Sequence, residues 1–269
     1  MMTDRITVKV PLTPIVLERM GQLSDLKVNS PNTETTENWK FNYLSWTCHG
    51  YEKFKNKDSG LLTIERKNNS SDDGFDLIIH QKTVNTDGIV NVVDAIISCN
   101  NDTLSTPLHW EMKSRFTDVH GKIRPELTLI RKAYIEGDVI HFNSNKCKST
   151  KKIKNRISSD WCLFDAVQRL PFENFPEIKF DTFEALYRFK PNQTLRFRDD
   201  FKQTIKGNIE LKCFTQIGEG VLPYEFWVDE NHKPLIVITF SRVYILKDKA
   251  NQIISKVIDD FRQGRIAYE

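Results

Sequence analysis

The sequence lacks the long apolar runs that membrane proteins need. No stretch approaches the roughly 20 consecutive apolar residues of a membrane-spanning helix. Pro11 and Pro14 interrupt the apolar content of the N-terminus, which therefore lacks the core of a signal peptide. We expect no membrane span and a cytoplasmic protein. A periplasmic location is the alternative if the chain is a mature or mis-started form of an exported protein.

The sequence also lacks a strong excess of either charge. It holds 39 basic and 36 acidic residues, a formal net charge of +3. This balance does not favour nucleic acid as a partner. The one concentrated basic run, residues 146–156, carries no interleaved aromatic residues. We interpret it as a solvated hairpin whose charges keep a sheet edge from pairing with other chains.

Motifs for metal binding and nucleophilic catalysis are missing. No CxxC, HxH, HExxH or GxSxG pattern occurs, so we expect no metal site and no cofactor. Most cysteines stand within apolar runs and are expected to be buried, whereas Cys147 stands among lysines and is expected to be exposed. The cysteines are Cys48, Cys99, Cys147, Cys162 and Cys213, and the histidines are His49, His80, His109, His120, His141 and His232.

What the sequence does contain is a long series of short apolar runs separated by turn residues. At 269 residues the chain is long enough for one large β domain. The pattern predicts strands one after another and no βαβ alternation, which indicates an antiparallel sheet. The last of these strands, within residues 209–246, form a predicted β-meander, in which residues 223–229 are predicted to be an edge strand. The predicted strands are 39–49, 61–66, 75–84, 89–99, 108–117, 133–142, 197–205, 209–216, 225–228, 234–240 and 243–246.

Three segments show helical signals, and a fourth is weaker. Thr13 before Pro14 predicts a capped helix over 14–26, residues 158–160 precede an amphipathic helix over 160–170, and 247–261 has apolar residues at helical spacing. Residues 180–189 suggest a further helical turn. We therefore divide the chain into an N-terminal helix and linker (1–38), one antiparallel β domain with an internal helix (39–246), and a helical C-terminus (247–269).

Residues 75–246 resemble a known fold. The helix that opens Ser-Asp-Trp-Cys-Leu-Phe-Asp-Ala-Val and the run from Gly218 through Trp227 to Pro234 resemble β-rich bacterial proteins of the lipoprotein-carrier type, LolA and LolB. The resemblance implies an incomplete antiparallel barrel wrapped around helices, with an apolar concavity. The predicted fold class is thus mainly β, a large curved sheet closed by one or two helices.

Two functional hypotheses follow, and we favour the non-enzymatic one. In the first, the concave face binds an apolar or lipid-like small molecule through aromatic side chains, unless these only fill the core around the internal helix. The candidate residues are Trp110, Phe116, Phe214, Phe226, Trp227 and Phe240.

The second hypothesis is a hydrolase. Glu219, Glu225 and Asp229 stand close in sequence to Trp227, and paired carboxylates beside an aromatic residue are typical of saccharide hydrolysis. An ester is the other substrate class that we consider. A structural or protein-interaction domain that uses sheet edges is a third alternative. The sequence does not predict the oligomeric state.

Overall fold

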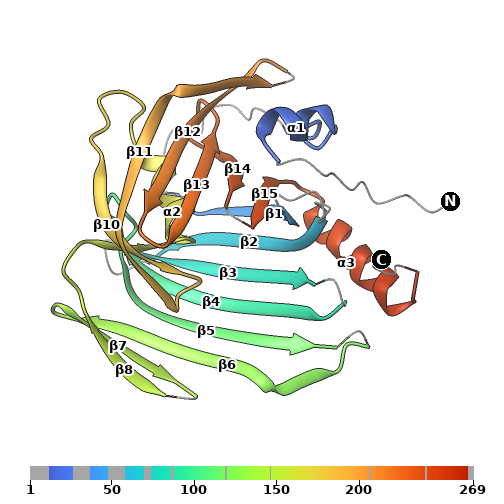
Figure 1. The fold of residues 1–269 in the computed structure, drawn as a ribbon, viewed down its shortest axis with the longest axis horizontal. Coiled ribbons are helices and arrows are strands. Elements are labelled where there is room, and N and C mark those ends of the chain that lie inside the picture. Colours follow the sequence, from blue (N-terminus) through green and yellow to red (C-terminus); the bar gives the residue numbers. More distant parts are fainter. Residues whose placement is uncertain are drawn as a thin grey trace.

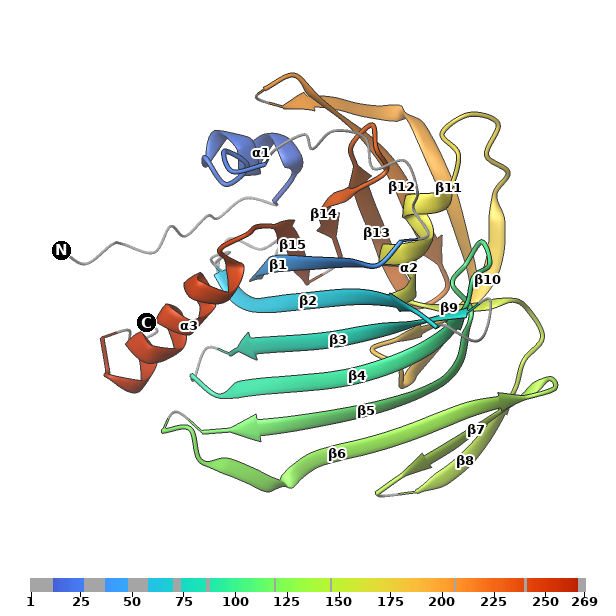
Figure 2. The ribbon, with the colours of Figure 1, turned by 180° about the vertical axis from the view of Figure 1, so that it is seen from behind.

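The computed structural model describes residues 12–26, 37–47, 58–69, 74–85, 88–118, 120–145, 147–205, 207–239 and 241–265. Its main feature is one 15-stranded sheet with the order β8-β7-β6-β5-β4-β3-β2-β1-β15-β14-β13-β12-β11-β10-β9. The sheet curves around on itself without closing into a complete barrel (Figures 1 and 2). The predicted fold class, a large curved antiparallel sheet with helices, is confirmed.

The strands pair with their neighbours in chain order, apart from the junction between β1 and β15. Every pair is antiparallel except β9 with β10, which is parallel. The strands are β1 (Trp39–Thr47), β2 (Asp58–Asn68), β3 (Gly74–Val84), β4 (Val90–Asn100), β5 (Pro107–Thr117), β6 (Ile123–Glu136), β7 (Val139–Ser144), β8 (Lys148–Lys152), β9 (Ile157–Ser159), β10 (Ile178–Glu184), β11 (Arg188–Ile205), β12 (Ile209–Gly218), β13 (Val221–Val228), β14 (Pro234–Ile238) and β15 (Arg242–Leu246).

The helices are short and lie on both faces of the sheet. They are α1 (Pro14–Arg19), α2 (Cys162–Ala166), the 3-10 turn η1 (Val167–Arg169) and α3 (Ala250–Arg262). The Thr13 hydroxyl accepts a hydrogen bond from the Val16 N–H at 3.3 Å, as a helix cap does. The predicted cap of α1 is confirmed, but the helix is shorter than the predicted 14–26 because it ends at Arg19. The predicted C-terminal helix is confirmed as α3. Among the described residues, no helix is long and apolar enough to cross a membrane.

The sheet separates two hydrophobic clusters. The inner cluster surrounds α2 and contains alternate side chains of the strands, such as Tyr43, Trp110 and Phe226. The outer cluster lies on the opposite face and joins the sheet to α1 and α3. Strand β1 serves both, because Tyr43 belongs to the inner cluster whereas Leu44 and Trp46 belong to the outer one. The predicted position of the internal helix, across the concave face, is confirmed.

Two predicted elements are wrong. Residues 180–189 are not helical: they form most of β10, a turn and the start of β11, because β10 pairs with β9 on one side and with β11 on the other. Residues 133–142 are not one strand, because Gly137, with a φ of 59°, lies in the turn that separates β6 from β7.

The edges of the sheet also differ in part from the prediction. Strand β13 lies between β12 and β14, so the segment around Trp227 is not an edge. The basic run does lie at an edge: β8 ends the sheet, and all five of its residues are exposed. This agrees with the interpretation of its lysines as charges that protect an edge. Asp87-Gly88, between the predicted strands 75–84 and 89–99, is a dipeptide typical of hairpin turns, but Asp87 lies outside the described residues.

Candidate functional site: a polar cavity beside the internal helix

Helix α2 lies inside the curve of the sheet, where all five of its residues are buried. Its first turn is held by Ser159, whose hydroxyl accepts a hydrogen bond from the Cys162 N–H at 3.1 Å. At its other end, the Gln168 side-chain amide donates to the Phe164 carbonyl at 2.9 Å. A single helical turn is not stable alone, so tertiary contacts must hold it in place.

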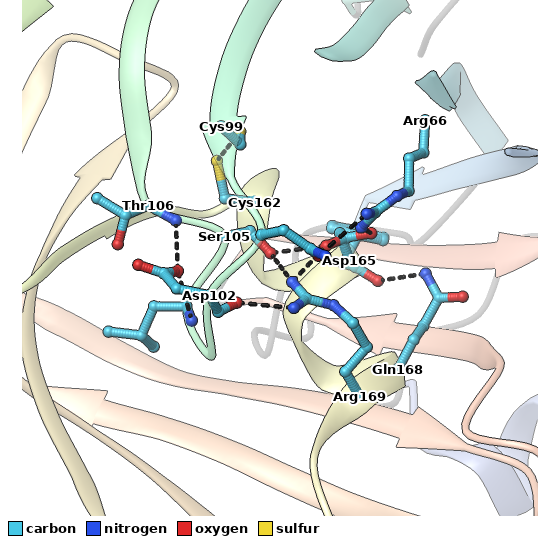
Figure 3. Close-up of polar contacts among 12 residues, drawn as sticks. Arg66, Cys99, Asp102, Ser105, Thr106, Cys162, Asp165, Gln168 and Arg169 are labelled. Atoms are coloured by element: carbon cyan, nitrogen blue, oxygen red, sulfur yellow. Dashed lines mark hydrogen bonds and ion pairs between the residues drawn. The ribbon is translucent and has the colours of Figure 1, made fainter. Parts of the chain in front are cut away.

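A buried ionic network fastens α2 to the sheet (Figure 3). The Arg66 guanidinium, on β2, donates to the Asp165 carboxylate at 2.8 Å, and Arg169 donates to the other carboxylate oxygen at 2.7 Å. The Ser105 hydroxyl also donates to Asp165, at 2.7 Å. Asp165 is fully buried and Arg66 nearly so, at 0% and 2% exposure. Three donors thus compensate one buried carboxylate, which fixes both the position and the rotation of α2.

A cavity of about 130 Å³ lies beside the first residues of this helix, on the concave side of the sheet. Its wall combines aromatic side chains with carboxylates, hydroxyls and a guanidinium. Side chains from α2 and the segment before it meet side chains from β3, β10 and β13–β15. The lining residues are Gln81, Asp160, Trp161, Phe164, Glu184, Ala185, Tyr224, Val237, Thr239, Ser241, Arg242 and Tyr244.

Asp160 is a carboxyl group whose pKa this environment raises strongly. Burial, together with the nearby negative charge of Glu184, raises the pKa of its carboxyl to about 7. Hydrogen bonds from the Trp161 N–H at 3.0 Å and from the Ala185 N–H at 3.1 Å oppose this shift. The carboxyl therefore changes its charge near neutral pH, where most aspartates are fully ionised.

Glu184, Tyr224 and Tyr244 also line the cavity. The Tyr224 hydroxyl donates to the Glu184 carboxylate at 3.2 Å. Burial raises the pKa of Tyr224 well above its usual value and that of Tyr244 to about 12, so both phenols keep their protons at physiological pH. The wall thus offers hydrogen-bond donors from phenols and acceptors from carboxylates within one small space.

The turn that carries Ala185 adopts a backbone conformation that its residues disfavour. Ala185 and Leu186 have φ values of 48° and 60°, whereas the turn type with two such residues prefers Asn-Gly. The Tyr187 N–H closes the turn onto the Glu184 carbonyl at 3.3 Å. Two contacts hold the turn: Leu186 is fully buried, and Asp160 accepts from the Ala185 N–H. Such strain is found more often at functional sites.

The aromatic residues predicted to bind a ligand are distributed over both faces. Trp110, Phe214 and Phe226 are buried in the inner cluster, and Phe226 packs edge-on against Phe164 of α2 with ring centroids 5.8 Å apart. Trp227 belongs to the outer cluster and stacks on Phe201 with ring centroids 6.1 Å apart. Phe116 is half-buried near the end of β5. Phe240 lies outside the described residues. Of the five that the structure describes, none lines the cavity beside α2.

The three acids of the hydrolase hypothesis do not converge. Glu219 lies in the turn before β13, where it accepts from the Asn192 amide at 2.8 Å. Glu225 accepts from the Trp227 indole at 2.9 Å. Asp229 follows the far end of β13 and accepts from the Asn231 and Lys233 N–H groups, each at 2.9 Å, so it orders a turn.

The carboxylates that do come together are Asp160 and Glu184, which we did not select from the sequence. The sequence predicts Asp160 at the start of the internal helix and Glu184 within a helical turn. One feature of the sequence could have pointed to Asp160: the polar run Ser-Ser-Asp stands directly before the apolar residues that begin with Trp161. Within the described residues, no group of three His, Cys, Asp or Glu side chains is arranged to bind a metal ion.

Comparison with known proteins gives a fold but no activity. No family model matches the chain. No curated protein matches it either. Among solved structures, the chain is similar to a β-barrel-like protein of the domain of unknown function DUF1849 from Brucella abortus, at 10% identity and a TM-score of 0.51. The match covers 77% of this chain and 95% of that one, and it supports a β-barrel-like fold.

Proposed function

We propose that this protein is a non-enzymatic binding protein that holds a small polar molecule in the cavity beside α2. The supporting observation is the convergence of the Asp160 and Glu184 carboxylates with the Tyr224 and Tyr244 phenols on one small cavity in the concave face. The wall is mixed, with carboxylate, phenol, hydroxyl, amide and guanidinium groups beside apolar surface. Polar groups that converge on a cavity fix the orientation of a ligand and give specificity.

The lining favours a ligand that donates hydrogen bonds at one end and has an apolar face at the other. The carboxylates accept hydrogen bonds, while Trp161, Phe164 and Val237 offer apolar surface. A sugar-like or amino-alcohol molecule has this chemistry. The volume of about 130 Å³ is close to that of about four water molecules, so the ligand, or the part of it that enters, is small.

A lipid carrier is the alternative that the resemblance to LolA and LolB implies. Such a protein needs an apolar space long enough for an acyl chain. The concave face is instead filled around α2 by a continuous cluster of buried side chains, among them Trp110, Phe164 and Phe226. This filling favours the small polar ligand. A hydrolase is less well supported, because Glu219, Glu225 and Asp229 each hold a local turn or strand contact.

A calorimetric titration at pH 8 tests the proposal. The panel contains monosaccharides, amino alcohols and a medium-chain fatty acid, and the variants are Asp160→Asn and Glu184→Gln. Each variant removes one charged acceptor, so we expect it to weaken binding of the polar ligand about 10-fold or more. Glu225→Gln is the matched control, because Glu225 lies on β13 next to the cavity residue Tyr224 but does not line the cavity.

Three outcomes count against the proposal. One is binding of the fatty acid with no binding of the polar compounds. Another is equal affinity of the wild type and both cavity variants for every ligand. The third is turnover of a glycoside or ester that Asp160→Asn abolishes, which would make the same carboxylates catalytic.

A further inference from the structure

Two cysteines from distant parts of the chain lie next to each other in the inner cluster. The sulfur atoms of Cys99, on β4, and Cys162, on α2, are 3.8 Å apart, although 63 residues separate them in sequence. Figure 3 shows the two side chains directed toward each other between the strand and the helix. Both are buried, with 1% and 0% exposure.

We propose that Cys99 and Cys162 form a disulfide that ties α2 to β4 when the chain folds in contact with a disulfide oxidant such as oxidised glutathione. To form the bond, the sulfur atoms must move from 3.8 Å to the bonding distance of about 2 Å. The bond would act beside the Arg66–Asp165 ion pair, as a second attachment of the same helix to the sheet.

The other described cysteines have no comparable partner. Cys213 belongs to the outer cluster, on the opposite face of the sheet, so the sheet itself separates it from Cys99 and Cys162. Cys147 is exposed and lies directly before the edge strand β8. Cys48 lies outside the described residues. The structure therefore selects one pair among the cysteines that it describes.

The reaction proceeds by two exchange steps. The thiolate of one cysteine attacks a sulfur of oxidised glutathione, whose S–S bond breaks, and one reduced glutathione leaves. The other cysteine then loses its proton and attacks the protein sulfur of the mixed disulfide, which releases the second glutathione. Two protein thiols are oxidised and one glutathione disulfide is reduced to two thiols.

Burial decides when the reaction occurs. Burial and the neighbouring Cys162 hold the pKa of the Cys99 thiol well above its usual value, so little thiolate forms in the folded protein. The folded, reduced protein should thus react slowly with the oxidant. The unfolded chain exposes both thiols, so the bond forms during folding and persists in an oxidising compartment.

Refolding in a glutathione redox buffer tests the inference. The full chain is unfolded in guanidinium chloride with a reductant, refolded by dilution into oxidised and reduced glutathione, alkylated, and digested without reductant. We expect a cross-linked peptide pair that contains Cys99 and Cys162 as the main disulfide product. The inference is overturned if both cysteines are alkylated, or if they pair equally with Cys48, Cys147 or Cys213.

Thermal unfolding provides the second readout. The bond closes a loop of 63 residues, so adding dithiothreitol should lower the unfolding midpoint of the oxidised protein by roughly 5–15 °C. Cys99→Ala and Cys162→Ala should abolish this shift, and Cys213→Ala, a buried cysteine of the other cluster, should retain it. An equal shift in Cys99→Ala would contradict the pairing. If the variants do not fold, the peptide map of the wild type decides alone.

Discussion

At the scale of single residues, Asp165 is the buried carboxylate that holds α2 to the sheet. Arg66, Arg169 and Ser105 all donate to its buried carboxylate. Asp165→Ala leaves Arg66 buried without its counter-charge, so we expect a loss of about 3–5 kcal/mol in the free energy of unfolding. Urea denaturation measures this. Glu111→Ala is the control, since its exposed pair with Lys132 should contribute no more than about 1 kcal/mol. Equal losses would contradict the role of the network.

Asp160 makes the stability of the protein depend on pH. Its pKa is about 7 in the folded protein, above the ordinary value near 4 that the unfolded chain has. The folded state therefore holds the extra proton between these two values, and the contribution of Asp160 to stability falls as the pH rises from about 4 to about 7. Above the folded pKa the loss is complete.

Asp160→Asn should remove this decline. With its oxygen in the Oδ1 position, the asparagine can still accept from the Trp161 and Ala185 N–H groups, which both donate to Oδ1 of Asp160. It loses the second contact of the Ala185 N–H, which is to Oδ2 at 3.1 Å. We expect the variant to be more stable than the wild type at pH 8, by about 1–2 kcal/mol, and to differ little at pH 4. Urea denaturation at the two pH values measures the difference. A variant that is less stable at pH 8 would show that the carboxylate is not penalised by its environment.

At the scale of elements, the turn between β10 and β11 stores strain at the edge of the cavity. Ala185 has a φ of 48°, which glycine adopts at little cost. Ala185→Gly should therefore stabilise the protein by about 1 kcal/mol, although glycine usually destabilises. Ala166→Gly, in the right-handed helix α2, should destabilise by about 1 kcal/mol or more. Thermal unfolding distinguishes the two, and destabilisation by both would contradict the strain.

The edge strand β8 gives a second prediction at this scale. Its residues are all exposed, and three of the five are lysines. Lys148→Val with Lys152→Val should expose an unprotected apolar edge, so aggregation should begin at several-fold lower protein concentration. The control is Lys249→Val with Lys256→Val, which removes the same charge beside and within α3. Light scattering measures the onset, and equal behaviour of the two double variants would contradict edge protection.

The elements also show what sequence patterns could predict. Runs of alternating apolar residues identified most strands, and the internal helix was recognised from its apolar face. The sequence predicts a helical turn over residues 180–189 because Glu184, Ala185 and Leu186 favour helices. Pairing of β10 with β9 and β11 makes most of this segment strand instead. The break at Gly137 was overlooked because apolar residues stand on both sides of it.

At the scale of the whole molecule, the site depends on information that local patterns do not carry. The curvature of the sheet brings Glu184 on β10, Tyr224 on β13 and Tyr244 on β15 to the same side of α2. Which face each side chain occupies depends on the register of successive strand pairs, and a shift of one residue reverses the faces. For this reason Trp227 was predicted for the concave face, although it lies in the outer cluster.

The most direct test of the cavity as a ligand site is a proton–nitrogen NMR titration at pH 8. The amides of Trp161 and Ala185 donate to Asp160, so they report on its carboxylate. A polar ligand from the panel should shift these two amides saturably in the wild type, and much less in Asp160→Asn. The signal of the Trp227 backbone amide should not shift, because the Trp227 side chain belongs to the outer cluster. A ligand that shifts Trp227 and leaves Trp161 and Ala185 unchanged would contradict the proposed site.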